Sequence, residues 1–269
     1  MRFPILAAIC ALLLSACGSA SRTDPLAAVQ ARKTLRVGVV ENSAPFCVRG
    51  PTGLRGFDVD IATAIANHLG AQPEFVAMAS SERLDAVASG RVDCVVAAMT
   101  MTRARERRVD FSVPYFQDGQ MILVRNADRA TITSYKDLAG RKVGVVTGTS
   151  NAETIAQVAP EAERVLFENR AAMRDALVAG SVDAITGDAF VLWGIQKSTP
   201  GIGLVGYRFS TEPYGVALPQ GASDLRDAVN AALMDMWESG EWREIYDTWF
   251  GKGTSFEAEI RFAVPVIPR

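Results

Sequence analysis

Histidine and cysteine are scarce in this sequence. The chain holds one histidine, His68, and four cysteines, Cys10, Cys17, Cys47 and Cys94. Zinc sites are mostly built from several Cys and His side chains, so this supply excludes most of them. A catalytic triad built on histidine would have to use His68. The sequence therefore predicts neither a bound metal nor a cofactor.

An excess of charge of one sign is also absent. Lys and Arg number 28 against 30 Asp and Glu, which gives a formal net charge of −2. A nucleic-acid-binding surface needs a basic excess, so we predict no nucleic-acid partner. The 49% apolar and 22% charged residues are ordinary values for a globular protein. A length of 269 residues allows one large domain or two smaller lobes.

The N-terminus carries the one extended apolar run. Arg2 gives a positive start, and residues 3–14 are apolar. This run is too short to span a bilayer permanently, but it suits the apolar region of a signal peptide. The Leu-Ser-Ala-Cys sequence that ends at Cys17 resembles the lipobox of bacterial lipoproteins. The resemblance implies a signal peptide over residues 1–16, a lipid on Cys17 and a tether over residues 17–29. A plain secretory signal is the alternative.

The remaining cysteines follow from this reading. Cleavage would discard Cys10, and lipidation would use Cys17. Cys47 and Cys94 would then lie in an oxidising compartment, where a pair of thiols tends to bond. We predict a Cys47–Cys94 disulfide, with two buried free thiols as the alternative.

A weak internal duplication indicates two α/β units. Residues 84–96 and 174–186 share the pattern of a short helix, a glycine and a β-rich strand, with Gly-x-Val-Asp in common. Upstream of each lies a nearly continuous apolar strand, at residues 35–40 and 142–147, as in a sheet covered on both faces. Chance similarity between amphipathic segments is the alternative.

Helices are predicted between the strands of each unit. In the first unit, apolar residues recur at a spacing of four over residues 58–69, and Gly70 ends the helix. In the second unit, residues 149–151 are candidate N-caps of a helix that runs through Val158. Two such units predict the α/β class with largely parallel sheets.

The ends of two predicted strands carry side chains suited to a binding site. Ligands of open α/β sheets bind at the C-terminal ends of strands. Thr100 and Arg105 follow one strand, and Asp188 follows the equivalent strand of the second unit. An arginine can hold a carboxylate with two parallel hydrogen bonds, and an aspartate can pair with an ammonium group. If these strand ends face each other across a cleft, the site suits a zwitterion.

Nine short motifs occur between about residue 33 and residue 251. They are Leu35-Arg-Val-Gly-Val, Pro45-Phe46, Gly56-Phe-Asp-Val-Asp, Thr100-x-Thr-x-x-Arg105, Val109-Asp-Phe-Ser-x-Pro-Tyr115, Leu138-x-Gly-x-Lys-Val-Gly-Val145, Thr147-Gly-Thr149, Tyr214-Gly215 and Ile245-Tyr-x-x-Trp-Phe-Gly251. In this order they resemble the family 3 solute-binding proteins of ABC transporters, which bind polar amino acids in the periplasm.

The resemblance implies an α/β fold of the periplasmic binding protein-like type II. Two α/β lobes would be joined by a hinge with two crossings, with a ligand cleft between them. Lobe 1 would comprise residues 30–116 and 214–251, and lobe 2 residues 117–213. Residues 252–269 would form a C-terminal extension that packs across a lobe.

The resemblance also implies roles for individual residues. Arg105 would hold the α-carboxylate of an amino acid, helped by the hydroxyl of Thr100. Asp188 would pair with the α-ammonium group. The turn that contains Thr147 and Thr149 would present the N-terminus of a helix to the cleft, where free N–H groups favour an anion.

Other positions bear on the ligand's side chain. Ser80 occupies a ligand-contact position at which many members carry an aromatic ring, and Ala98, with its backbone carbonyl, replaces the family's glycine. Residues 80–84 resemble a segment of glutamate and aspartate binders whose arginine, carried onto Arg83, contacts a side-chain carboxylate. Arg170 can reach the same place. We therefore predict an acidic amino acid, while other small polar amino acids, including cystine, remain open.

The implied function is that of the substrate-binding component of an ABC importer. A monomer, lipid-anchored in the periplasm or cell envelope, would capture its ligand by hinge closure and deliver it to a membrane permease. One alternative is an enzyme similar to cyclohexadienyl dehydratases, with Glu41 or Glu168 as the general acid. The other is a sensory ligand-binding protein. The sequence holds no specific catalytic signature, so we predict no enzyme.

Overall fold

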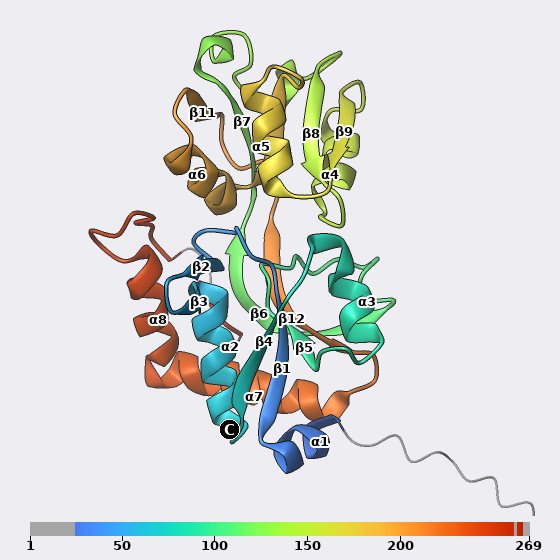
Figure 1. The fold of residues 1–269 in the computed structure, drawn as a ribbon, viewed down its shortest axis with the longest axis vertical. Coiled ribbons are helices and arrows are strands. Elements are labelled where there is room, and N and C mark those ends of the chain that lie inside the picture. The colour runs from blue at the N-terminus through green and yellow to red at the C-terminus, as the bar shows by residue number, and fades with distance from the viewer. Residues whose placement is uncertain (1–24, 261–262, 266–269) are drawn as a thin grey trace, which may run out of the picture.

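Two α/β lobes lie one above the other in the computed structural model, which describes residues 25–260 and 263–265 (Figure 1). Within these residues the strands form two five-stranded sheets and a small two-stranded sheet. The predicted fold class is confirmed. The predicted signal peptide over residues 1–16 and the predicted lipidation site Cys17 lie outside the described residues.

Lobe 1 is built from the N-terminal part of the chain and from a segment that returns to it. Its strands are β1 (Thr34–Val39), β2 (Val48–Gly50), β3 (Gly53–Arg55), β4 (Gln72–Ala77), β5 (Cys94–Val95), β6 (Val109–Asp118) and β12 (Glu212–Pro219). Its helices are α1 (Pro25–Arg32), α2 (Phe57–His68), α3 (Arg83–Ala88), α7 (Ser223–Ser239) and α8 (Glu241–Phe250). None of the helices in the described part of the chain is long and apolar enough to cross a membrane.

Lobe 2 is formed by the segment between β6 and β12. Its strands are β7 (Gln120–Arg125), β8 (Lys142–Val146), β9 (Glu163–Phe167), β10 (Ala184–Asp188) and β11 (Ile202–Val205). Its helices are α4 (Asn151–Val158), α5 (Arg170–Val178) and α6 (Ala189–Ser198). The helices predicted to follow the apolar strands are thus α2 and α4.

The duplication seen in the sequence recurs in the sheets. In lobe 1 the strand order is β4-β1-β5-β12-β6, and in lobe 2, read from the other edge, it is β9-β8-β10-β7-β11. The first three strands of each sheet are parallel, and the fourth is antiparallel to the third. The duplicated segments correspond to α3 with β5 and to α5 with β10, and the left-handed glycines Gly90 and Gly180 follow the two helices.

The chain crosses between the two sheets twice. β6 ends at Asp118, and Gly119 alone separates it from β7. The second crossing runs through residues 206–211 into β12, whose first residue, Glu212, pairs with Asp118. A Cβ atom on Gly119 would lie 2.3 Å from the backbone oxygen of Ser210, so the two crossings touch and no larger residue fits here without a shift.

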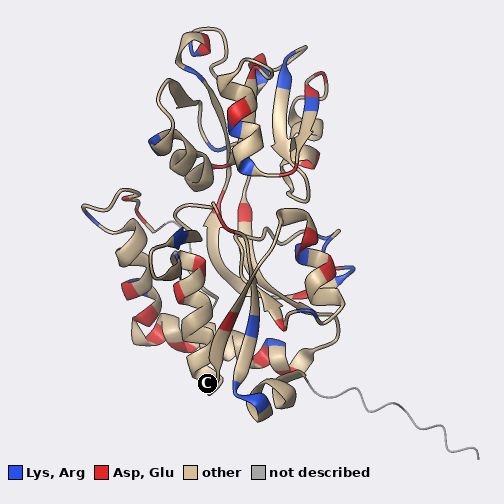
Figure 2. Ribbon diagram, in the orientation of Figure 1, with Lys and Arg blue, Asp and Glu red and all other residues tan. Residues whose placement is uncertain are grey.

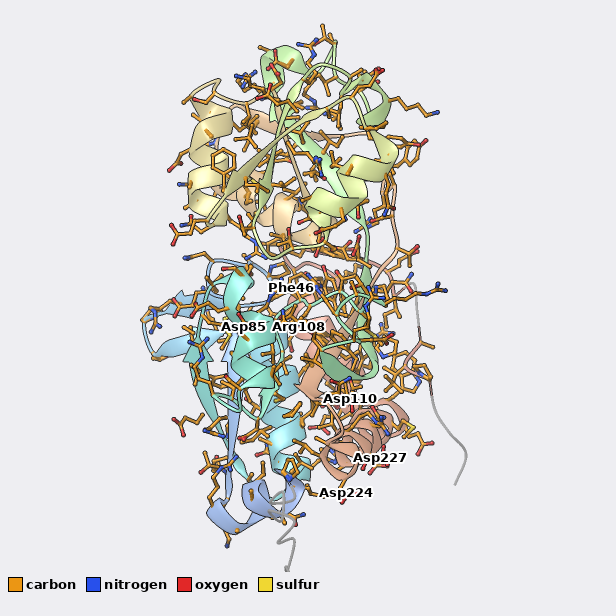
Figure 3. All side chains as sticks on the ribbon, turned by 90° about the vertical axis from the view of Figure 1, so that its right-hand side faces the viewer. Phe46, Asp85, Arg108, Asp110, Asp224 and Asp227 are labelled. Carbon is orange, nitrogen blue, oxygen red and sulfur yellow. The ribbon has the colours of Figure 1, made fainter. Side chains whose placement is uncertain are left out.

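Aromatic side chains fill the core of lobe 1 next to lobe 2. Phe46 is fully buried and lies near the junction of the lobes (Figure 3). Its ring centroid is 5.2 Å from that of Phe116 in β6 and 5.5 Å from that of Tyr214 in β12. Phe190 and Val191, at the start of α6, belong to the same core. The two hinge strands, β6 and β12, and the start of α6 therefore share one packed core. This core holds the two crossings side by side.

The predicted Cys47–Cys94 disulfide is not present, because both residues are free and buried. Cys94 lies on β5 inside the sheet, whereas Cys47 lies on the loop before β2. Burial, and then the negative charge of Asp58, raises the pKa of Cys47 to about 12, and burial also raises the pKa of Cys94. Each thiol is packed as a small apolar side chain in the core of lobe 1.

Both ends of the described chain pack on lobe 1. Residues 25–29, which the sequence placed in a tether, belong to helix α1, because Pro25 suits a first helical turn and Val29 is fully buried in the core. At the other end, Ala258 donates from its backbone N–H to the carbonyl of Phe250, 2.8 Å away. The ring of Phe256 lies 5.6 Å from that of Trp193 in α6, so the extension touches both lobes.

Candidate functional site

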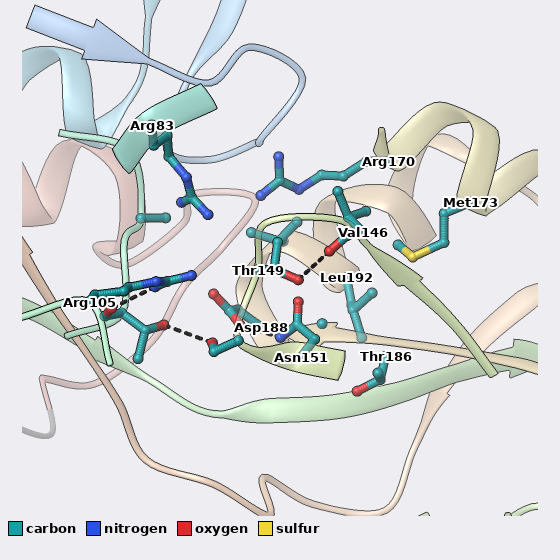
Figure 4. Close-up of a pocket in the computed structure, with 15 residues that line it drawn as sticks. Arg83, Arg105, Val146, Thr149, Asn151, Arg170, Met173, Thr186, Asp188 and Leu192 are labelled. Carbon is teal, nitrogen blue, oxygen red and sulfur yellow. Dashed lines mark hydrogen bonds between the residues drawn. The ribbon is translucent and has the colours of Figure 1, made fainter. Parts of the chain in front are cut away.

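A cavity lies between the lobes where the C-terminal ends of β5, β8 and β10 meet (Figure 4). Its free volume is small, about 20 Å³. Seven of the nine predicted ligand-binding residues line it, namely Arg83, Ala98, Thr100, Arg105, Thr149, Arg170 and Asp188. The remaining lining residues are Val146, Ser150, Asn151, Met173, Thr186, Gly187, Val191 and Leu192.

Arg105 lies at the floor of this cavity with only 8% of its surface exposed. Its Nη1 atom donates to the carbonyl of Thr100, 2.6 Å away, and Nη2 donates to the carbonyl of Gly148 in lobe 2, 3.1 Å away. The nearby Arg108 points away and pairs with Asp85 on the surface of lobe 1, at 2.5 Å. In this basic run of four arginines, at positions 103, 105, 107 and 108, Arg105 alone is buried.

Arg83 is held as firmly as Arg105 and is 2% exposed. It donates to three backbone carbonyls, those of Ser80 (3.0 Å), Ala97 (2.9 Å) and Gly148 (2.9 Å). The Gly148 carbonyl therefore accepts hydrogen bonds from two arginines of lobe 1, which joins the lobes across the cleft. This arrangement is a closed one.

Arg170 reaches the cavity from the first turn of α5, on the opposite wall (Figure 4). Its guanidinium has no hydrogen bond or ion pair among the described residues. Burial lowers the pKa of Arg170, and the charges of Asp188, Tyr214 and Asp58 counteract this in part. Arg170 is half-buried, and its guanidinium, which has no partner among the described residues, is free to pair with a negative group.

Among the residues that the structure describes, Asp188 is the only carboxylate that lines the inner cavity, that is, the cavity between the lobes. Its Oδ1 atom accepts from Nδ2 of Asn151 (3.2 Å), and Oδ2 accepts from the hydroxyl of Tyr214 (2.6 Å). Burial, and then the negative charges of Glu212 and Asp118, raises the pKa of Asp188 to about 6.

Charge in the cavity is unbalanced, although elsewhere both signs are scattered over the two lobes (Figure 2). Arg83, Arg105 and Arg170 face Asp188 alone. Burial, and then the positive charges of Arg105 and Arg170, lowers the pKa of Arg83 to about 9. Beneath the site, Asp58 accepts from the hydroxyl of Tyr115 at 2.8 Å, and burial raises the pKa of Asp58 to about 7. Among the described lining residues, positive side chains therefore outnumber negative ones.

Two predicted residues do not line the inner cavity. Thr147 is exposed and lines only an outer groove, which runs along one side of the cleft between Thr147 and Glu212. Thr149 lines both this groove and the inner cavity. Ser80 lies on the other side, and its carbonyl, rather than its hydroxyl, serves the site through Arg83. Thr149 donates from its hydroxyl to the carbonyl of Val146, so a ligand would meet the turn before α4 rather than a free threonine donor.

Sequence reasoning missed Asn151 and Tyr214 as partners of Asp188. Tyr214 stands in one of the recognised motifs, but the motif alone does not reveal a contact between residues 26 positions apart in two lobes. Asn151 is 5% exposed and was considered only as a helix cap. A buried amide at the first position of a helix beside the site was the available signal.

Comparison with known families decides the class of this protein. The family model of the bacterial extracellular solute-binding proteins, family 3, matches residues 35–252. The chain belongs to this family. Two features of the site agree with such a binding protein: the cavity lies between the two lobes, and backbone groups of both lobes contribute to it.

Relatives of this solute-binding protein include several amino-acid-binding proteins. The ABC transporter glutamine-binding protein GlnH of Bacillus subtilis is 36% identical over 253 residues, which cover 88% of this chain and 92% of that protein. The L-cystine-binding protein TcyJ of Escherichia coli K12 is 33% identical over 225 residues, 83% of this chain and 85% of that protein.

A solved structure with the same fold is an ancestral arginine-binding protein bound to arginine. It has 40% sequence identity and a TM-score of 0.78, and the match covers 82% of this solute-binding protein and 99% of that chain. The named ligands of these relatives include neutral and basic amino acids. The family therefore fixes the class of ligand, and the cavity itself must supply the choice of side chain.

Proposed function

We propose that this solute-binding protein captures an acidic L-amino acid and delivers it to the permease of an ABC importer. The observation that carries the choice of an acidic ligand is the partnerless guanidinium of Arg170, which faces the buried Arg83. Two positive groups that converge on one cavity repel each other, and a carboxylate between them relieves both.

The charges of the cavity support one orientation of the ligand. The α-carboxylate binds the guanidinium of Arg105 on lobe 1, beside Thr100. The α-ammonium group binds Asp188 on lobe 2. The side-chain carboxylate then points toward Arg83 and Arg170. A glutamate or aspartate, with net charge −1, offsets part of the cavity's positive excess, whereas arginine would add to it.

Hinge closure is the mechanism that we propose. Lobe 1 supplies Arg83 and Arg105, and lobe 2 supplies Asp188, Arg170 and the turn around Gly148. A ligand that contacts both walls binds the closed form more tightly than the open form, and that difference alone shifts the balance toward closure. The closed form is then recognised by the permease.

A role in transport also agrees with the predicted lipidation site near the N-terminus. A lipid on Cys17 would hold the donor near its membrane, since more than one acyl chain gives stable anchoring. We therefore place the protein in the periplasm or cell envelope, as a lipid-anchored monomer.

An enzymatic role has less support. The inner cavity contains neither Glu41 nor Glu168, the two acids that the sequence offered as general acids. Both line a separate pocket at the outer edge of the cleft, and Glu41 is paired there with Arg49. The curated relatives described above are binding proteins of transporters.

Replacing Arg170 by glutamine tests the choice of ligand. A charge-assisted hydrogen bond contributes about 1.5–3 kcal/mol, so Arg170→Gln should weaken glutamate binding at least about tenfold. Binding of glutamine should change little, because its amide carries no charge. Arg174→Gln is the matched control, since Arg174 is one turn further along α5 and pairs only with its neighbour Asp175. Isothermal titration measures both; an equal loss for glutamate and glutamine would contradict the proposed orientation.

Amino-acid binding should also weaken in acid. The ammonium group of the ligand needs Asp188 ionised, and the pKa of Asp188 in the empty site is raised to about 6. Binding therefore displaces a proton below that pH, and affinity should fall about tenfold from pH 7 to pH 5. Asp188→Asn should bind weakly at both pH values. Tryptophan fluorescence titrations at the two pH values provide the measurement; an affinity that is unchanged at pH 5 would exclude Asp188 as the ammonium partner.

A further inference from the structure

A cluster of buried polar side chains lies at the second hinge crossing. Glu212, the first residue of β12, is 3% exposed. Its Oε1 atom accepts from Nε2 of Gln120 (2.7 Å) and from the hydroxyl of Ser210 (2.8 Å). Its Oε2 atom accepts from the hydroxyl of Ser150 (3.2 Å). Gln120 is fully buried and also donates to the hydroxyl of Thr154, 2.9 Å away.

This cluster links the hinge to one wall of the ligand site. Ser150 occupies the N-cap position of α4 without a capping hydrogen bond from its side chain, and the hydroxyl of Thr154 donates to the Ser150 carbonyl (3.0 Å). Ser150 and Asn151 line the inner cavity, and Asn151 donates to Asp188. Glu212 does not line the inner cavity. It therefore acts on the site through the start of α4 and through its charge near Asp188, and not by touching the ligand.

A carboxylate is the group that this place requires. Three donors converge on Glu212, and a carboxylate accepts from all of them with its two oxygens. A glutamine amide has one acceptor oxygen and would turn an NH2 group toward at least one donor. In a buried cluster, an unsatisfied donor carries the full cost of desolvation.

We propose that Glu212 is a positioning residue that sets the start of α4 against the hinge, so that Ser150 and Asn151 reach their ligand-facing positions. The consequence for amino-acid capture rests on the proposed function. The positioning itself does not, because it concerns contacts within the protein. Glu212 thereby connects β12, at the second hinge crossing, to the wall of lobe 2 that meets the ligand.

The test compares Glu212→Gln with Glu153→Gln. Glu153 is exposed in the first turn of α4 and also lies near Arg105, so its variant removes the same charge without touching the cluster. Hydrogen exchange of the amides at residues 149–152 needs no ligand. We expect it to become at least about fivefold faster in Glu212→Gln and to stay unchanged in Glu153→Gln. Unchanged exchange in Glu212→Gln would overturn the inference.

Binding and its pH dependence provide the second readout. L-Glutamate is the probe, and Glu212→Gln should weaken its binding about tenfold, against less than twofold for Glu153→Gln. The negative charge of Glu212 helps to raise the pKa of Asp188, so the acid limb of binding should also move to lower pH in Glu212→Gln alone. Unaltered affinity and an unaltered acid limb would contradict the inference. Failure of the unmodified protein to bind any amino acid would instead contradict the proposed function.

A second variant covers a failure of Glu212→Gln to fold. Ser150→Ala removes the contact on the α4 side, together with a 3.4 Å contact between the hydroxyls of Ser150 and Thr100, and leaves the other two donors of Glu212 in place. It should reproduce the faster exchange at residues 149–152. Where both variants fold, exchange at residues 149–152 in the double variant should be no faster than in Glu212→Gln alone, because the two substitutions act on that segment through one contact. Fully additive effects on exchange would overturn the inference.

Discussion

Arg105→Ala should abolish measurable amino-acid binding. The guanidinium is almost fully buried, and its bonds to the carbonyls of Thr100 and Gly148 hold it at the floor of the cavity. Two charge-assisted hydrogen bonds to the α-carboxylate contribute about 3–6 kcal/mol, so their loss should weaken binding more than about a hundredfold. Isothermal titration with L-glutamate measures the loss.

The control for this substitution lies two residues away. Arg107→Ala removes the same side chain from an exposed position in the same basic run and should leave affinity unchanged. Arg105→Lys keeps the positive charge but loses the two-pronged geometry, so it should recover only part of the affinity. If Arg105→Ala bound glutamate within tenfold of the unmodified protein, the α-carboxylate would have to bind elsewhere.

Gly148→Ala should prevent full closure of the cleft while leaving each lobe folded. Gly148 has a φ of +79°, and a Cβ atom there would lie 2.4 Å from Cα of Ser81 on the opposite lobe. The clash is with backbone, so a side-chain rotation cannot relieve it. Overpacking of this kind costs about 1–3 kcal/mol, which corresponds to a loss of affinity of roughly 5- to 150-fold.

The matched control separates this clash from backbone strain. Gly140 has a φ of +69° in the same lobe, and a Cβ atom there would meet nothing within 4 Å. Gly140→Ala therefore carries the same left-handed strain without the contact between lobes. We expect both variants to lose similar thermal stability and only Gly148→Ala to lose affinity. Small-angle scattering with L-glutamate should show a smaller compaction for Gly148→Ala; equal affinity in the two variants would contradict closure through this contact.

The sequence was sufficient to predict the parts of the site that follow from local pattern. Thr100, Arg105 and Asp188 follow strands, so the strand-end rule marks them as members of one site if the two strand ends face each other. The duplication of α3-β5 as α5-β10 was visible from the glycines that end the two helices, Gly90 and Gly180. A glycine at the end of a helix is also a local pattern. These residues therefore lie where the pattern put them.

Contacts between segments that are distant in the sequence could not be predicted from local pattern. Tyr214 meets Asp188 only because β12 begins at the cleft, where the chain returns to lobe 1. The direction of a turn decides that Thr149 faces inward and Thr147 outward, and residue type does not reveal it. The Cys47–Cys94 pairing was inferred from compartment alone, whereas packing in the core accommodates both thiols without a bond.

The choice of an acidic ligand is the central claim, and one titration series tests it directly. The purified protein is titrated at pH 7.5 with L-glutamate, L-aspartate, L-glutamine and L-arginine. The charges of Arg83, Arg105 and Arg170 predict that glutamate or aspartate binds at least about tenfold more tightly than glutamine, and that arginine binds weakest. Binding of glutamine or arginine without binding of either acid would contradict the account.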